Sequence, residues 1–251
     1  MEIDEFLKLV RKRRSIRKFK PDPIPDEYID KILEAARWAP SGGNGQPWEF
    51  IVIKDQEIKK KLAGAYDRYQ EMARVVEMTR FEEYRQPAFR IQGSPEAIAK
   101  EIRARFSVWR DAPVIIAVLG DQRAMQASTL AARLFEYHTF DQNLTTANYA
   151  IHLAAAALGL GAQWISIPRP CAEEMKSILR VPAVHTLFTL NPIGYPAIKP
   201  VPYRRELNEM VHYDKYDMSK FRSNNDILEY IKYQRQRHAK GKTYATGAKE
   251  S

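Results

Sequence analysis

The sequence predicts a layered domain of the α/β or α+β class, in which helices pack on a central sheet. Four runs rich in β-branched and aromatic residues predict strands at 49–53, 113–120, 162–167 and 185–190. The segments between these runs are long enough to form helices. A chain of 251 residues can bury a full core, either in one large domain or in two small ones.

Two helices are predicted before the first strand. Apolar residues within 6–10 predict the first helix, which runs into a basic cluster. The second helix is predicted over 27–38, with Asp26 as its N-cap and with Pro40 after its end. A loop rich in glycine and polar residues, APSGGNGQPW, then leads into the first strand.

The most apolar helix candidate lies at 143–159. Its alanine, leucine and isoleucine side chains cover more than half of the helix circumference, as expected for a helix buried in a core or in a subunit interface. Gly159 and Gly161 follow as stop signals. After the fourth strand, proline and glycine within 191–196 interrupt the strand pattern.

Two segments depart from the core pattern. Residues 66–110 are polar, aromatic and highly charged, and an insertion of this kind between core strands predicts a lid or an arm. Residues 213–251 also lack a core pattern, although DILEYIKYQRQRHAKGK favours a basic helix. We therefore expect one domain at 1–212 that carries the lid, followed by a C-terminal extension that wraps a partner subunit or is partly disordered.

The composition limits the classes of protein. A net charge of +9 is typical of proteins that bind nucleic acid or anionic ligands, although 31 acidic residues are spread among the 40 basic ones. The single cysteine, Cys171, excludes an intrachain disulfide and a site of several thiolates, so we expect a cytoplasmic protein. Acidic residues near Met1 argue against a transit peptide. The longest mostly apolar stretch, 150–162, is too short to span a bilayer.

Three arginines gather in the basic cluster that follows the first helix. Arg13, Arg14 and Arg17 lie within five residues of one another, with Ser15 between them. Guanidinium groups match phosphate oxygens bidentately, so the cluster can hold a phosphate dianion. The alternative is a solvated basic end of a helix, where cations are favoured by the helix dipole.

The glycine-rich loop is the second candidate site. Glycines let the backbone approach a ligand closely, and Ser41, Asn44 and Gln46 carry donors and acceptors that suit the pyrimidine edge of a flavin or a nucleobase. An ordinary connection between a helix and a strand would have a similar composition. The loop is not G-x-G-x-x-G, and the chain contains no Walker motif, which argues against the usual dinucleotide and P-loop sites.

Other kinds of catalytic site have little support. The sequence contains no G-x-S-x-G and no H-E-x-x-H, and its five histidines lack the spacing of metal ligands, so we expect no metal. Cys171 follows Pro170 near the start of a predicted helix, where the pKa of a thiol can fall. A packing role for this cysteine is the stronger hypothesis.

The two candidate motifs occur in a fixed order. RRSIRKF at 13–19 and APSGGNGQPWEF at 39–50, with a helix between them, resemble the N-terminal signature of the FMN-dependent nitroreductase family. Further segments, DAPVIIAV, LAAAALGLGAQWIS and NPIGYPAIKPVPYRRELNEMV, also resemble the family, so the resemblance spans 1–212 apart from 66–110. It implies a nitroreductase-like α+β fold, a three-layer sandwich whose central, mostly antiparallel sheet is flanked by helices. It also implies a domain-swapped homodimer with two FMN sites at the interface.

The resemblance implies roles for individual residues. The group around the FMN phosphate and ribityl chain corresponds to Arg13, Arg14, Ser15, Arg17 and Arg204, with Arg205 as the alternative to the last. The loop that lies against the isoalloxazine ring, usually supplied by the other subunit, corresponds to Pro40, Ser41, Gly42 and Asn44. The contact to the N5 and O4 edge of the flavin, where we expect the catalytic residue, corresponds to Ser166 or a neighbouring main-chain amide.

The function implied is that of an FMN-dependent NAD(P)H oxidoreductase. NADH or NADPH reduces FMN and leaves, and an electron-poor small organic acceptor, such as a nitro- or quinone-like aromatic, then takes its place in a ping-pong mechanism. Substrate choice is predicted to lie in the insertion, whose aromatic and cationic side chains suit an aromatic acid. The residues expected to contact the substrate are Tyr66, Tyr69, Tyr84, Arg105 and Trp109. A lid that only shields the flavin is the alternative.

Two other functions remain open. A lid in a similar position occurs in the branch that contains iodotyrosine deiodinase and the flavin-cleaving synthase of dimethylbenzimidazole, so reductive dehalogenation or flavin cleavage is one alternative. The Glu, Tyr and Lys substrate clamp of the deiodinase has no obvious counterpart here. A basic nucleic-acid-binding protein that uses RKRRSIRKFK and RQRHAKGK is an alternative of another class. On the main hypothesis we expect a homodimer with a small-molecule substrate and with neither nucleic acid nor membrane as a partner.

Overall fold

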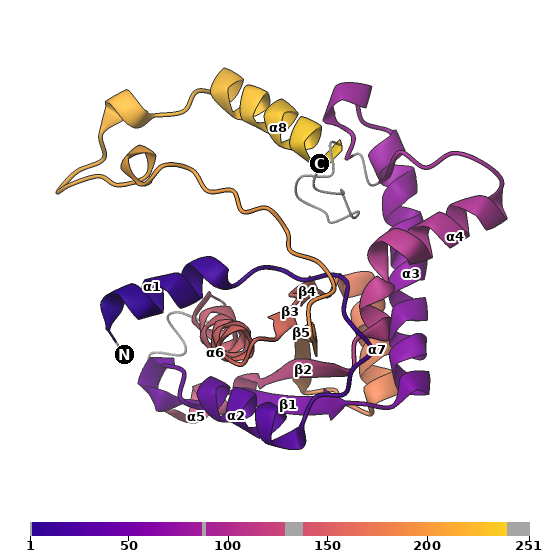
Figure 1. Ribbon diagram of the computed structural model, residues 1–251, viewed down its shortest axis with the longest axis vertical. Helices are drawn as coiled ribbons and strands as arrows, with labels where there is room; N and C mark the ends of the chain where they lie inside the picture. Colours follow the sequence, from indigo (N-terminus) through magenta and orange to yellow (C-terminus); the bar gives the residue numbers. More distant parts are fainter. Residues whose placement is uncertain (1, 87–88, 129–137, 240–251) are drawn as a thin grey trace.

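The computed structural model describes residues 2–86, 89–128 and 138–239 (Figure 1). Its strands are β1 (Trp48–Ile53), β2 (Val114–Asp121), β3 (Gly161–Ala162), β4 (Ile165–Ser166) and β5 (His185–Gly194). Its longer helices are α1 (Ile3–Lys12), α2 (Asp26–Arg37), α3 (Gln56–Met78), α4 (Pro95–Phe106), α5 (Gln122–Ser128), α6 (His138–Ala157), α7 (Arg169–Leu179) and α8 (Asn224–Ala239). In the described residues, no helix is long and apolar enough to cross a membrane.

The strands form one sheet in the order β1-β2-β5-β3, and β4 also pairs with β5. All of these pairings are antiparallel. The central strand β2 alternates strictly between two cores. Its residues in the core with α2 and α6 are Val114, Ile116 and Val118. Its residues in the core with α3 and α7 are Ile115, Ala117 and Leu119. The predicted α+β fold, an antiparallel sheet between two helical layers, is confirmed in this chain.

The predicted strand at 162–167 is divided into β3 and β4, although both pieces keep one register against β5. Ala162 lies opposite Ile193, and Ile165 lies opposite Leu190, so Gln163 falls opposite Pro192. The amide of Gln163 donates to the carbonyl of Pro192 at 3.1 Å. Proline has no N–H to return this bond, and the ladder therefore breaks at this point.

The last strand runs further than predicted. β5 continues through Asn191, Pro192 and Ile193 to Gly194, where the proline and glycine were expected to end it. On its other side Pro192 lies opposite Ile115 of β2 without interrupting the pairing. In an antiparallel ladder the N–H and C=O of one residue face the same neighbour, so the missing donor of Pro192 affects only the edge strand.

Two helix boundaries also differ from the predictions. Asp26 is the first residue of α2 rather than its N-cap, which is Pro25, and the Asp26 carboxylate pairs with Lys54 instead. The second difference is at the start of α6. Its predicted start was residue 143, whereas the described part of α6 begins at His138. Gly159 ends that helix as predicted, with φ of 76° and with the Leu160 amide bonded to the Ala155 carbonyl at 2.8 Å.

The predicted lid begins inside a helix rather than at a loop. α3 starts at Gln56, and its first half packs in the core, so only its outer half projects beyond the sheet (Figure 1). The buried Lys59 side chain donates to the carbonyls of Ala112 and Pro113 at 2.8 and 3.2 Å. This contact joins the residues just before the insertion at 66–110 to the residues just after it.

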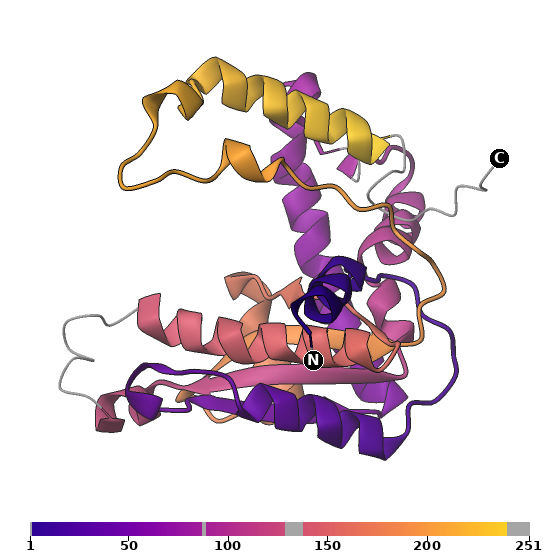
Figure 2. The ribbon, with the colours of Figure 1, turned by 60° about the vertical axis from the view of Figure 1, so that its left-hand side comes forward.

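The C-terminal extension returns to the lid. After β5 the chain runs outward and back, and α8 lies beside the outer end of α3 in both views (Figures 1 and 2). α8 packs against the short helix η2 (Glu82–Tyr84) of the lid. The ring of Tyr233 on α8 contacts the ring of Tyr203 edge to face, and the two ring centroids are 6.0 Å apart. The predicted basic helix is confirmed over 224–239, whereas 240–251 lie outside the described residues.

Candidate functional site

The arginine motif is fixed to the edge of the sheet immediately after α1. Ser15 forms an isolated parallel bridge with Ala162 of β3, and the Ile16 amide donates to the Ala162 carbonyl at 3.0 Å. Further along, Phe19 bridges to Pro196, just beyond β5. Backbone bonds on both sides therefore hold the motif extended along the same edge.

A glycine makes this close approach possible. Gly161 lies under Ile16, and a Cβ at Gly161 would be 2.4 Å from Cγ1 of that isoleucine. Ile16 is only 5% exposed and anchors the motif in the protein, while the arginines on either side are half-buried. In the sequence analysis Gly161 was interpreted only as a stop signal after a helix.

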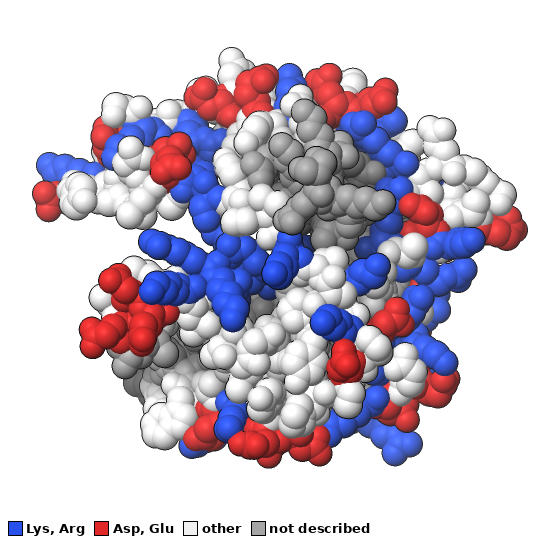
Figure 3. All heavy atoms as spheres, in the orientation of Figure 1, with Lys and Arg blue, Asp and Glu red and all other residues white. Residues whose placement is uncertain are grey.

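Arg204 joins the N-terminal arginines, although 190 residues separate it from Arg14. Burial, and then the positive charges of Arg204 and Arg13, lower the pKa of Arg14. The positive charges that act on Arg14 therefore come from both ends of the chain, Arg13 before it and Arg204 after β5. Figure 3 shows Lys and Arg side chains gathered at a hollow between the body and the C-terminal extension.

The two candidate arginines that follow β5, Arg204 and Arg205, have different partners. Arg205 forms an ion pair with Glu209 at 3.0 Å, whereas Arg204 donates to the neighbouring carbonyl of Tyr203 at 2.6 Å and has no acidic partner among the described residues. Arg17 is half-buried, and its guanidinium lies 3.5 Å from the Ser15 carbonyl. The positions of Arg13, Arg14 and Arg204 therefore favour these three as the anion-binding group.

A buried histidine lies beneath this cluster. Nε2 of His152, on α6, lies 3.0 Å from Oδ1 of Asn191, whose amide nitrogen donates to Oδ1 of Asn148 at 2.6 Å. Burial lowers the pKa of His152 to about 4, and the positive charge of Arg13 adds to that effect. The imidazole is thus neutral at physiological pH and forms part of a polar network inside the core.

The neutral His152 predicts a stability that depends on pH. Its folded pKa of about 4 lies below the ordinary value of 6.5, so the unfolded chain binds the proton first as the pH falls. We expect the free energy of unfolding to decrease by about 2–3 kcal/mol between about pH 7 and pH 4.5 through this group. Urea denaturation at both pH values, compared with His152→Gln, checks this. An equally steep decrease in the variant would exclude His152 as the source.

The glycine-rich loop has an unusual backbone. Within it Gly43, Asn44 and Gln46 have φ of 58°, 54° and 43°, and positive φ is costly for the two residues that carry side chains. The Gln46 amide donates to the Ser41 hydroxyl at 3.1 Å, which closes the loop on itself. Two α6 residues that the sequence analysis missed, Asn143 and Thr146, bond to the loop from outside.

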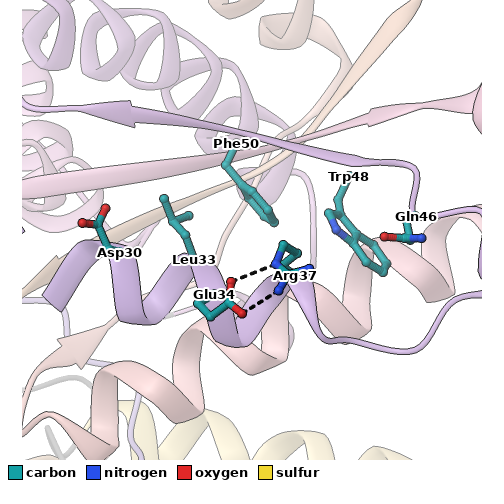
Figure 4. A pocket seen from close by; sticks show the side chains of 7 residues that line it. All are labelled: Asp30, Leu33, Glu34, Arg37, Gln46, Trp48 and Phe50. Atoms are coloured by element: carbon teal, nitrogen blue, oxygen red, sulfur yellow. Dashed lines mark hydrogen bonds and ion pairs between the residues drawn. The ribbon is translucent and has the colours of Figure 1, made fainter. Parts of the chain in front are cut away.

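A surface groove of about 430 Å³ borders this loop, between α2 and β1 (Figure 4). Leu33, Trp48 and Phe50 form its apolar wall, and the Arg37–Glu34 ion pair at 2.6 Å lies on its rim. Of the candidate loop residues Gln46 lines it, whereas the arginine motif, Ser166 and the predicted substrate residues do not. The arginine cluster on the β3 side of the sheet is therefore a separate site.

Ser166 lies on the same sheet edge as the arginine motif. It is exposed, pairs with Thr189 of β5, and follows Ala162 along one register. Cys171, at the start of α7, is buried, and burial raises the pKa of its thiol. The possible activation of this thiol is therefore not supported. In the described residues, no group of three His, Cys, Asp or Glu is placed to hold a metal ion.

The predicted substrate residues divide into separate groups. Tyr66 contacts Tyr69 and Trp109, with ring centroids 6.4 and 5.9 Å away, at the base of the lid. Trp109 is 1% exposed and belongs to the core. Tyr84 lies at the outer end of the lid, beyond the last 12 residues of α3, which measure about 18 Å along the helix. Arg105 pairs with Glu101 on α4 at 2.6 Å.

Comparisons with known proteins agree with the motifs. The model of the nitroreductase family matches residues 10–195. A "Putative NADH dehydrogenase/NAD(P)H nitroreductase" from Archaeoglobus fulgidus is 31% identical over 77% of this chain and 87% of the relative. A 5,6-dimethylbenzimidazole synthase from Rhodospirillum rubrum is 30% identical over 76% of this chain and 82% of the relative. An iodotyrosine deiodinase from Danio rerio is 26% identical over 83% of this chain and 66% of the relative.

A solved structure extends the likeness to the fold. A Desulfovibrio desulfuricans protein, described as a "putative nitroreductase in complex with fmn", has a TM-score of 0.55 and 27% identity, covering 84% of this chain and 97% of that one. The match of the family model to most of the chain agrees with the two ordered motifs and with the layered fold. The chain therefore belongs to the nitroreductase family and is an enzyme of that family.

Proposed function

We propose that this protein is an FMN-dependent oxidoreductase that uses NADH or NADPH to reduce an electron-poor small organic acceptor. The observation that carries the proposal is the gathering of three arginines: Arg13 and Arg14 are held beside β3 by the Ser15–Ala162 bridge, and Arg204 comes close enough for its charge to act on Arg14. Like charges held together are stabilised when an anion binds between them. Membership of the nitroreductase family and the FMN complex of a relative make the phosphate of FMN the anion that fits.

The remaining predicted residues lie at positions that suit the rest of the cofactor. Ser166 is four positions after Ala162, which lies beside the arginine motif, and this spacing corresponds to about 13 Å along the edge. This is of the order of the length from the phosphate to the ring of FMN. The loop at Pro40, Ser41, Gly42 and Asn44, with its short turn at Gly42–Asn44, is proposed to lie against the flat ring.

FMN, when bound, supplies the hydride and electron chemistry. The chain holds the phosphate dianion with Arg14 and Arg204, and the positive charge of these residues favours negative charge in the bound ligand. The Ser166 hydroxyl offers a hydrogen bond to the polar edge of the ring. Neither the contact to the phosphate nor the hydrogen bond to the ring needs a strong acid or base from the protein. The neutral His152 and the buried Cys171 therefore have structural roles.

We propose that the active form is a homodimer, in which the glycine-rich loop of one chain faces the flavin of the other. Large apolar side chains remain exposed on α1, and others follow one another along the chain between β5 and α8. They include Ile3, Phe6, Leu7, Val201, Leu207, Met210, Met218 and Phe221. A surface of this kind favours burial against a partner chain, in this case a second copy.

The acceptor is proposed to bind below the lid. Tyr69 and Tyr66 are half-buried at its base and suit an aromatic acceptor, whereas the burial of Trp109 favours a packing role. The likeness to iodotyrosine deiodinase and to dimethylbenzimidazole synthase favours dehalogenation or flavin cleavage as the second candidate.

Reoxidation of the reduced enzyme by a panel of acceptors tests these proposals. We expect nitroaromatics and quinones to reoxidise the flavin fastest. Faster reaction with iodotyrosine would favour the dehalogenase, and loss of FMN on exposure to oxygen would favour the flavin-cleaving activity. If no acceptor reoxidises the flavin faster than oxygen does, the proposed reduction of an organic acceptor is wrong.

A further inference from the structure

The glycine-rich loop rests on one stripe of α6. Thr139, Asn143 and Thr146 are spaced four and three residues apart, so they share one face of the helix. The Gly42 amide donates to Oδ1 of Asn143 at 3.0 Å, and the single proton of the Thr146 hydroxyl is shared between the carbonyls of Pro40 at 2.9 Å and Asn143 at 2.7 Å. A Cβ at Gly42 would be 3.0 Å from Cγ2 of Thr139, so the backbone lies almost against the helix.

The Asn143 side chain is fixed on both sides. It is 5% exposed, and while its oxygen accepts from the loop, its amide nitrogen donates to Sδ of Met125 on α5 at 3.0 Å. These two partners set the orientation of the amide group, because the Gly42 amide can only donate. Asn143 therefore links the loop to a buried point of the fold.

The loop needs such an external contact. Asn44 and Gln46 adopt positive φ, which residues with side chains rarely do, and the surrounding structure must hold them there. Inside the loop, the described side chains supply bonds from Gln46 to Ser41 and to Asn44. Among the described residues, the side-chain bonds that tie the loop to the body of the protein come from the α6 stripe, and the Asp121 amide donates to the Pro47 carbonyl at the end of the loop at 2.8 Å.

We propose that Asn143 is the positioning residue for the glycine-rich loop, with Thr146 as a second fastening, and that it sets the geometry in which the loop meets the flavin. Asn143 acts through Gly42 and does not touch the cofactor. This inference rests on the proposed function only for its effect on FMN. The fastening itself is a property of the protein without flavin.

Asn143→Leu tests the inference, with Asn148→Leu as the matched control. Both residues are buried asparagines of α6, so both changes should lower the stability, but Asn148 bonds to Asn191 and not to the loop. In the flavin-free protein we expect hydrogen exchange at the Gly42 amide to become about tenfold faster in Asn143→Leu, the factor for one lost hydrogen bond. Asn148→Leu should leave this exchange rate near that of the unmodified protein.

The binding of FMN is the second measurement. We expect the dissociation constant to rise about tenfold in Asn143→Leu and to stay within about twofold in Asn148→Leu. If both variants change Gly42 exchange and FMN affinity equally, Asn143 has only a structural role. If exchange responds as expected but neither the unmodified protein nor the variants bind FMN, the fastening stands, and it is the proposed function that fails.

Thr146→Val covers the case in which Asn143→Leu does not fold. This change removes the bond to the Pro40 carbonyl from a half-buried position, and Thr145→Val at the exposed neighbouring position is its control. We expect FMN affinity to fall about threefold in Thr146→Val and to stay unchanged in Thr145→Val. Equal affinities in this pair would overturn the α6 stripe as the element that positions the loop.

Discussion

Replacing both Arg14 and Arg204 with alanine is expected to abolish the retention of FMN during purification. Each charge-assisted hydrogen bond to the phosphate contributes about 1.5–3 kcal/mol, so the dissociation constant should rise by a factor of about 10²–10⁴. The flavin-free variant should be no less stable than the unmodified protein, because the change removes repulsion between like charges at Arg14. Titration with FMN and thermal unfolding of the flavin-free proteins measure both effects.

Arg205→Ala is the matched control for this experiment. Arg205 is next to Arg204 in the sequence, but its guanidinium is paired with Glu209. We expect its removal to change FMN affinity by less than about threefold, since its guanidinium is held by Glu209 and not by the phosphate. If Arg205→Ala abolished binding and the double variant did not, the assignment of Arg204 to the phosphate would be reversed.

Gly161→Ala should displace the whole arginine motif without altering any arginine. The added Cβ would be 2.4 Å from Cγ1 and 2.7 Å from Cβ of Ile16, so the strand bearing the motif has to move. Overpacking of this kind costs about 1–3 kcal/mol of stability. We also expect FMN affinity to fall at least about tenfold, because the guanidinium groups move with the backbone. Urea denaturation of the flavin-free protein and FMN titration measure the two effects.

Gly64→Ala provides the comparison for the added methyl group. In α3 a Cβ at Gly64 has its nearest contact 3.7 Å away, at the end of the flexible Arg68 side chain, so this change should stabilise the helix slightly. Combining Gly161→Ala with Ile16→Ala should cost less than the sum of the two single changes, since one fills space that the other opens. Strict additivity would show that Gly161 and Ile16 do not interact as described.

The helical layers and the strands of the core were predictable because local patterns dictate them. The run at 113–120 is apolar throughout, as a strand buried on both faces has to be, and it became the central strand β2. The division of the edge strand was not predictable from that strand's own sequence. It depends on Pro192, which lies 29 residues beyond Gln163 in the chain and opposite it in the sheet.

The site was predictable to the extent that its residues lie in short motifs. The arginines at 13–17 and the loop at 40–44 are both local, whereas the positions of Arg204 and Gly161 depend on tertiary contacts. Asn143 left one signal in the sequence, as a polar residue in the most apolar helix. Buried polar residues of this kind usually hold a specific partner, and here the partner is the loop.

The composition of the lid did not predict where its side chains lie. Residues 66–110 are polar on average, yet Ile102 and Trp109 are fully buried and the aromatic residues predicted to meet the substrate lie in more than one place. Average polarity does not distinguish an amphipathic helix over the core from a free arm. The contact of α8 with η2 joins the lid to the C-terminal extension, which lies beyond the part of the chain that the family model matches.

The most direct test of the proposed function is the anaerobic reaction of the purified protein with NADH or NADPH. We expect a yellow protein whose flavin absorbance bleaches on addition of the nicotinamide and returns when an electron-poor acceptor is added. A colourless protein that does not take up FMN in a titration, and whose retention on DNA falls steeply with salt, would contradict the proposed function and favour the nucleic-acid-binding alternative.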